Sequence, residues 1–210
     1  MGNNESERKY WDRHAGNYDR SMLLLGRPLP RMVELASSAV DGASRVLEVA
    51  AGTGLVTESL ARSAQEVVAT DYSTAMVSTL EARVRAVGLR NVRCEQADLY
   101  DLRFEPRSFD AVVAANVLHL VLDLPAALAA LRHMLRPGGR LIVPTYCHDE
   151  TAISWTVSRI LAATGFPGRR RFTLQRLRRS LEEAGLRLGR TELLPGLIPI
   201  GYAEGTFHDP

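Results

Sequence analysis

Three acidic residues lie at the ends of successive β-branched runs in the first half of the chain. Glu48 closes RVLEV, Asp71 closes VVATD, and Asp98 follows the next run in QADL. A loop of small residues, 50–54, comes shortly after Glu48. Small residues let a ligand approach the backbone, and a carboxylate can accept hydrogen bonds from both hydroxyls of a ribose. Three acids at three strand ends therefore predict a site for a positively charged adenosine derivative.

The same loop is poorly suited to a dinucleotide. Glu48 would repel a pyrophosphate, and a G-x-G-x-x-G fingerprint that starts at Gly52 needs glycine or alanine where Thr57 stands. No Tyr-x-x-x-Lys pair can form, because Lys9 is the only lysine. An NAD-dependent oxidoreductase is therefore the alternative that these residues disfavour. Taken singly, Asp71 could also cap a helix and Asp98 a loop.

Two histidines follow the fourth and fifth β-branched runs. His119 lies in NVLH and His148 in TYCHD. Imidazole changes charge near neutral pH, so each is a candidate general base for an acceptor hydroxyl or acidic carbon. Each also has a structural interpretation, His119 as an orienting or packing residue and His148 as a solvated loop residue.

The elements that must position these residues follow the rhythm of an α/β fold. Strands are predicted at 45–49, 66–70, 91–95, 109–115, 139–146, 186–193 and 197–202. Helices are predicted at 55–64, 73–87, 125–135, 151–164 and 173–184. Strands that alternate with helices favour a parallel sheet covered by helices. The acids and histidines would then meet at the carboxyl edge of that sheet.

Length and composition limit the classes of protein further. A chain of 210 residues predicts one domain, with an N-terminal lid at 1–40, a cofactor-binding core at 41–147 and a substrate-side region at 148–210. A net charge of +2 is too balanced for a dedicated nucleic-acid binder. The first ten residues lack the apolar core of a signal peptide, and no 18-residue apolar run predicts a membrane span. Only Cys94 and Cys147 are present, which favours the reducing cytoplasm.

Residues 168–179 concentrate positive charge, with six arginines and no acid. Such a run is usually a solvated helix face. An anionic acceptor, a nucleic acid or peripheral contact with an anionic membrane are the functional alternatives. We expect a monomer or a homodimer.

Five motifs in order carry a resemblance to a known family. The runs VLEVAAGTG, QADLYDL, FDAVVAANVLHLV and LRPGGRLIVPT, with the strand end at Asp71, resemble the class I S-adenosylmethionine-dependent methyltransferases. The likeness is strongest to the type 11, small-molecule branch of quinone and phospholipid methyltransferases. It implies a Rossmann-like, seven-stranded, mostly parallel sheet with an antiparallel last strand and helices on both faces. It also implies metal-free, in-line transfer from S-adenosylmethionine to a small molecule, with S-adenosylhomocysteine as product.

The resemblance also implies a role for individual residues. The loop after the first strand would hold the methionine portion, Asp71 the ribose, Asp98 the adenine edge, and Asn116 would border the methyl group. One departure is Ala50, which stands where the family has its first loop glycine. The implied cofactor contacts are Tyr18, Glu48, Ala50, Gly52, Thr53, Gly54, Asp71, Tyr72, Met76, Ala97, Asp98, Leu99, Asn116 and Val117.

The acceptor should occupy the other half of the carboxyl edge. Its expected contacts are His14, His119, Tyr146, His148 and Trp155. In the helix at 151–164 the predicted buried face holds Ile153, Thr156, Val157, Ile160, Leu161 and Thr164. Trp155 lies off that face, where it is either a surface residue or part of the acceptor pocket, and we favour the pocket. Whether the acceptor atom is oxygen, nitrogen, sulfur or carbon stays open, and a non-catalytic S-adenosylmethionine-binding subunit is a third interpretation.

Overall fold

The computed structural model describes residues 2–17, 28–163 and 166–207. Its strands are β1 (Arg45–Val49), β2 (Glu66–Asp71), β3 (Val92–Gln96), β4 (Phe109–Val113), β5 (Leu135–Ile142), β6 (Thr145–Tyr146), β7 (Leu186–Leu194) and β8 (Ile200–Phe207). Its helices are α1 (Gly2–His14), the 3-10 turn η1 (Ala15–Asn17), α3 (Leu29–Ala39), α4 (Thr57–Ser63), α5 (Thr74–Val87), α6 (Leu124–Met134), α7 (Ala152–Ala163) and α8 (Leu174–Glu183). Each strand and helix predicted from residue 45 onward is present, with shifted ends.

The strands form one sheet in the order β3-β2-β1-β4-β5-β8-β6, and β7 pairs with β8 outside this path. The first five strands pair in parallel, whereas β8 runs antiparallel to β5, β6 and β7. The predicted parallel sheet with an antiparallel last strand is therefore confirmed. The described residues contain eight strands instead of seven, because Pro144 separates β6 from β5. A proline has no N–H for the ladder and ends regular pairing.

Proline also explains why the last strand begins later than predicted. The strand expected at 197–202 runs from Ile200 to Phe207, directly after Pro199. It extends further because β5 pairs along one side of it and β7 along the other. Tyr202 and Ala203 of this strand are completely buried, one in each of the two cores that flank the sheet.

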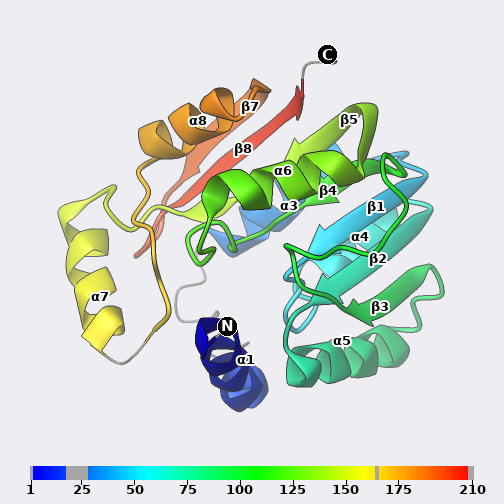
Figure 1. Cartoon of the computed structure of the whole chain (residues 1–210), viewed down its shortest axis with the longest axis horizontal. Coiled ribbons are helices and arrows are strands. Elements are labelled where there is room, and N and C mark those ends of the chain that lie inside the picture. Colours follow the sequence, from blue (N-terminus) through cyan, green and yellow to red (C-terminus); the bar gives the residue numbers. More distant parts are fainter. Residues whose placement is uncertain (1, 18–27, 164–165, 208–210) are drawn as a thin grey trace.

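Helices cover both faces of the sheet (Figure 1), and the strands alternate their side chains between two cores. Val46 of β1 packs with Leu60 of α4 and Leu80 of α5 on one face. Its neighbour Leu47 packs on the other face, in a core that includes Leu131 of α6. Because helices cover both faces, a polar ligand site can form only at the edge of the sheet where the strands end.

The helix α7 differs from the sequence prediction in the face that it buries. Ile153 and Ile160 were expected to pack inward, but each is 62% exposed. Ser154 and Ser158 are buried instead. The Ser154 hydroxyl bonds with Thr151 just before the helix, and the Ser158 hydroxyl donates to the carbonyl oxygen of Ser154. Val157 and Leu161 do pack against the core as predicted. Thr164 lies outside the described residues.

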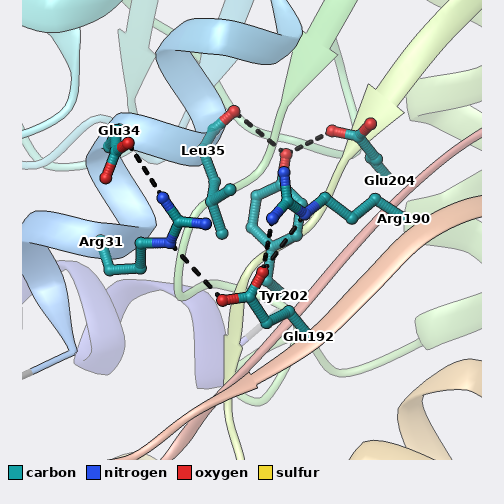
Figure 2. A network of polar contacts seen from close by, with 7 residues as sticks. All are labelled: Arg31, Glu34, Leu35, Arg190, Glu192, Tyr202 and Glu204. Carbon is teal, nitrogen blue, oxygen red and sulfur yellow. Dashed lines mark hydrogen bonds and ion pairs between the residues drawn. The ribbon is translucent and has the colours of Figure 1, made fainter.

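A polar network fastens α3 to the far strands (Figure 2). Arg31 pairs with Glu34 at 2.9 Å and with Glu192 of β7 at 3.5 Å, and Arg190 also bonds Glu192. The hydroxyl of Tyr202 lies 3.2 Å from the carbonyl oxygen of Leu35. The network fixes the helix that carries Met32, a neighbour of the cavity described next.

Candidate active site

One cavity opens at the carboxyl ends of β1, β2 and β4, at the edge that the sequence predicted. It encloses about 950 Å³, part of it open to solvent. The predicted cofactor residues that line it are Ala50, Gly52, Asp71, Tyr72, Met76, Ala97, Asp98, Leu99, Asn116 and Val117. The remaining lining residues are Trp11, Val49, Thr70, Tyr100, Ala115, Leu120, Val121 and Leu122.

Asp71 joins the two loops that form one wall of the cavity. Its Oδ2 accepts a hydrogen bond from the Gly52 amide at 2.8 Å, and its Oδ1 accepts one from the Ser73 amide at 2.8 Å. Burial raises the pKa of the carboxyl group, and these backbone bonds act in the opposite sense. Each oxygen keeps a further lone pair. Asp71 thus makes the turn contact of its structural interpretation and still lines the cavity.

Glu48 does not line the cavity. Its side chain is buried, and the Thr57 hydroxyl donates to Oε2 at 2.6 Å. Burial raises the pKa of this carboxyl group to about 8, with a smaller contribution from Asp71. Glu48 therefore fastens the start of α4 to β1. Thr57, the residue that breaks the dinucleotide fingerprint, is its hydrogen-bond donor.

The loop after β1 depends on left-handed backbone. Ala50, Gly52 and Gly54 have φ of 52°, 57° and 88°. A Cβ on Gly54 would lie 2.6 Å from Cδ1 of Leu80, so close packing as well as backbone conformation requires glycine there. Ala50 takes the same conformation with a side chain, which strains it. Thr53 is buried, and Thr53 and Gly54 shape the loop without lining the cavity.

The N-terminal helix supplies two residues that the sequence analysis did not assign. Trp11 lines the cavity, and Asp12 accepts hydrogen bonds from Ser73 Oγ at 2.5 Å and from the Ala75 amide at 3.3 Å. Ser73 is the N-cap of α5, so Asp12 adds a second acceptor at that helix end. Figure 1 shows α1 near α5 at this edge. The sequence signal was the aromatic and acidic run at 10–12.

Asn116 stands where the fourth strand has ended. It has a φ of 53°, which asparagine tolerates better than most residues. Its Nδ2 lies 3.5 Å from Sδ of Met32. Its Oδ1 is buried and has no hydrogen-bond partner among the described residues. A ligand in the cavity could therefore donate a hydrogen bond to this oxygen.

Beyond Asn116, four rings form a cluster beside the cavity. The ring of His119 lies 5.1 Å from that of His148, 5.8 Å from that of Tyr146 and 6.1 Å from that of Phe166. Phe166 also contacts Trp11 edge-on at 6.3 Å. The sequence analysis placed His119, Tyr146 and His148 in one region, and they do lie together. It did not include Phe166, whose sequence neighbours are glycines and a proline. The ring cluster of His119, Tyr146, His148 and Phe166 does not itself line the cavity.

Both histidines in the ring cluster are buried and held in the neutral form. Burial lowers the pKa of His119 well below its usual value, and the neighbouring His148 adds to this. Burial and the positive charge of Arg171 lower the pKa of His148 to about 4, against a smaller opposing effect of Asp149. Nδ1 of His119 and Nε2 of His148 are buried without a hydrogen-bond partner on any described residue.

Comparison with known proteins fits this geometry. Residues 47–143 match the model of a family described as "Methyltransferase domain". This stretch carries Glu48, Asp71 and Asp98. The match covers slightly less than half of the chain, and it shows what these residues are similar to.

Curated relatives that resemble this chain include two bacterial enzymes. The chain is 35% identical over 136 residues to a demethylmenaquinone methyltransferase of Clavibacter sepedonicus, which covers 63% of this chain and 55% of that protein. It is 34% identical over 141 residues to a malonyl-[acyl-carrier protein] O-methyltransferase of Halorhodospira halophila, covering 66% and 47%. The chain thus spans about half the length of these relatives.

Solved structures show the same fold at lower identity. A SAM-dependent methyltransferase from Aquifex aeolicus superposes with a TM-score of 0.72 and 21% identity, covering 93% of this chain and 98% of that one. The magnesium protoporphyrin IX methyltransferase of Synechocystis gives a TM-score of 0.75 and 18% identity, covering 97% and 99%. The Rossmann-like methyltransferase fold is therefore established.

Two of the expected acceptor contacts lie away from the cavity, and one expected cofactor contact falls outside the described residues. Trp155 is 46% exposed on the outer face of α7, where the guanidinium of Arg159 covers its ring. It points outward because Ser154 and Ser158 occupy the inner face. His14 is exposed on α1, stacked on Tyr10 at 4.1 Å. Tyr18 lies outside the described residues.

The arginine-rich segment holds one wall of the cavity. The amides of Arg169 and Arg170 donate to the carbonyl oxygen of His119, each at 3.0 Å. The guanidinium of Arg170 donates to the carbonyl oxygens of Val121 and Leu122. At least one arginine of this run is therefore structural, which neither the solvated-face nor the anion-binding interpretation included.

Two further observations concern the described residues as a group. Within 2–17, 28–163 and 166–207 no three His, Cys, Asp or Glu side chains gather as a metal site. The helices of the same ranges are all too short or too polar to cross a membrane.

Proposed function

We propose that this protein is an S-adenosylmethionine-dependent methyltransferase with a small-molecule acceptor. The observation that carries the proposal is the cavity at the carboxyl edge, in which Asp71 and Asn116 offer acceptor oxygens between apolar walls. The family match over residues 47–143 supports it. No observation favours a dinucleotide in this cavity or a non-catalytic role.

The residues of the cavity fit the parts of this cofactor. Trp11 and Met76 give apolar surface for a flat adenine ring. Asp71 can accept hydrogen bonds from the ribose hydroxyls, and Asp98 and Leu99 line the part of the cavity where the adenine edge would form hydrogen bonds. The unpartnered Oδ1 of Asn116 can accept from a charged amino group. Neutral Glu48 supports the loop from behind and does not repel the ligand's carboxylate.

When bound, S-adenosylmethionine supplies a methyl group already activated on a sulfonium. The chain's own residues then have to align an acceptor and exclude water from it. The ring cluster offers an apolar wall and unpartnered ring nitrogens for that purpose. We infer that residues 1–40 act as a lid, 41–147 bind the cofactor and 148–210 lie on the acceptor side. We further propose that the enzyme works in the cytoplasm as a monomer or homodimer.

Calorimetric titration with S-adenosylmethionine, S-adenosylhomocysteine and NAD tests this proposal. We expect both sulfur compounds to bind and NAD to give no measurable heat. Formation of S-adenosylhomocysteine with a panel of phenols, amines, thiols and acidic carbon compounds then tests catalysis. Binding of NAD in place of S-adenosylmethionine would overturn the proposal.

A further inference from the structure

Ser158 on α7 contacts the ring of His148. Its Oγ lies 2.7 Å from Nδ1 of His148 and 2.6 Å from the carbonyl oxygen of Ser154. Ser158 is 6% exposed and His148 is 5% exposed, so water does not compete freely for these bonds.

The hydrogen count of this contact fixes the protonation of the ring. A serine hydroxyl has one hydrogen, and a carbonyl oxygen can only accept. Ser158 must therefore donate to Ser154, and its oxygen accepts from His148. Nδ1 of His148 consequently carries the ring hydrogen, and Nε2 presents a bare lone pair.

That lone pair is left without a donor on the described part of the chain. An unpartnered buried polar atom costs roughly 1–3 kcal/mol, so a folded protein seldom keeps one without a use. The neighbours of His148 are aromatic rings. Their centroids lie 5.1 Å (His119), 6.1 Å (Tyr146) and 6.3 Å (Phe166) from the centroid of the His148 ring. Because Nε2 is buried and the ring cluster does not line the cavity, a ligand reaches this atom only if the cluster opens.

We propose that Ser158 is a positioning residue that holds His148 as its Nδ1–H tautomer, so that the Nε2 lone pair selects a neutral acceptor bearing an O–H donor, such as a phenol. The inference rests on the proposed function, because it assigns the acceptor of that site. A protonated amine is disfavoured, because Arg171 places positive charge close enough to His148 to repel it. The charges around His148 are those of Arg171 and Asp149, and His119 is neutral.

Nitrogen NMR of protein labelled at histidine reads the tautomer without any ligand. In the parent, we expect Nδ1 of His148 at the position of a protonated nitrogen and Nε2 at that of an unprotonated one. Ser158→Ala should give a mixture of tautomers, and Ser158→Thr, which keeps the hydroxyl, should restore the single form. Ser154→Ala is the matched control: it removes a buried hydroxyl from the same helix but leaves the carbonyl that Ser158 uses.

Phenol and benzylammonium are the probes for selectivity, each added with S-adenosylhomocysteine present. Phenol should shift the Nε2 signal, benzylammonium should not, and Ser158→Ala should weaken phenol binding about tenfold. The proposal is overturned if the parent carries the hydrogen on Nε2, if Ser158→Ala keeps one tautomer, or if benzylammonium alone shifts the signal. If S-adenosylhomocysteine fails to bind, the proposed function fails, but the tautomer measured on the protein alone still decides the role of Ser158.

Discussion

Asp12 accepts a hydrogen bond from Ser73 Oγ at 2.5 Å, across 61 positions of sequence. Ser73 is itself the N-cap of α5 and accepts from the Met76 amide at 3.1 Å. The N-terminal helix, the helix cap and a cavity-lining residue are thus joined in one chain of contacts. Trp11, the neighbour of Asp12, is held against the cavity by this arrangement.

Replacing Asp12 by alanine should loosen the N-terminal helix and weaken cofactor binding. The loss of one capping acceptor is worth roughly 1 kcal/mol, which corresponds to about fivefold in affinity for S-adenosylhomocysteine. Hydrogen exchange of residues 8–17 should rise, and ligand should protect these amides less than in the parent. Asp41→Ala, an exposed change outside this site, is the control. Unchanged exchange in Asp12→Ala would show that the contact does not hold the helix.

Asp71→Ala should weaken binding of S-adenosylmethionine by about 1.5–3 kcal/mol, the usual loss for a hydrogen-bonded carboxylate. Part of this loss will come from the Gly52 and Ser73 amides, which lose their acceptor. Calorimetry on folded protein measures the change. Asp101→Ala, whose partner is the exposed Arg103, should bind like the parent. Equal affinity for the parent and Asp71→Ala would remove Asp71 from the site.

Backbone strain in the loop after β1 predicts opposite outcomes for two substitutions. Ala50→Gly relieves a left-handed alanine and should raise the free energy of unfolding by about 0.5–1 kcal/mol. Gly54→Ala should lower it by about 2 kcal/mol or more, because its Cβ would meet Leu80 at 2.6 Å. Urea unfolding of both variants measures the difference. A less stable Ala50→Gly protein would contradict the strain at that residue.

The raised pKa of Glu48 predicts that the free energy of unfolding falls as the pH rises. Its pKa is about 8 in the folded state, above the usual 4.5, so the folded protein keeps a proton that the unfolded chain has lost. The free energy of unfolding therefore decreases from pH 4.5 to pH 8, by at most about 1.4 kcal/mol per pH unit. The lowered pKa values of His119 and His148 act oppositely below pH 6.5, so the slope is compared between pH 6.5 and 8. The raised pKa of Asp71 acts in the same sense as that of Glu48, so a Glu48 variant is needed to separate the two.

Glu48→Gln should flatten this slope, since glutamine imitates the neutral acid at every pH. Glu58→Gln, at an exposed pair with Arg62, should leave the slope as in the parent. Urea unfolding at several pH values between 6.5 and 8 gives the comparison. A slope that survives in Glu48→Gln would place the titrating group elsewhere.

The sequence alone determined the strands and helices from residue 45 onward. Periodicity, caps and glycines are local signals, and the strand ends after Glu48, Asp71 and Asp98 are set by them. The family resemblance supplied the mostly parallel sheet with its antiparallel last strand, and most of the cavity lining. These predictions succeeded because a parallel sheet necessarily gathers its strand ends at one edge.

Only the tertiary structure decided how individual side chains are used. Glu48 turns from the cavity to Thr57, because strand alternation sends it to the opposite face from its neighbours. On α7, Ser158 is buried against the ring of His148, whereas Trp155 is exposed. Asp12 and Phe166 reach the site from distant parts of the chain. Contacts of this kind depend on packing between elements, which local sequence patterns do not encode.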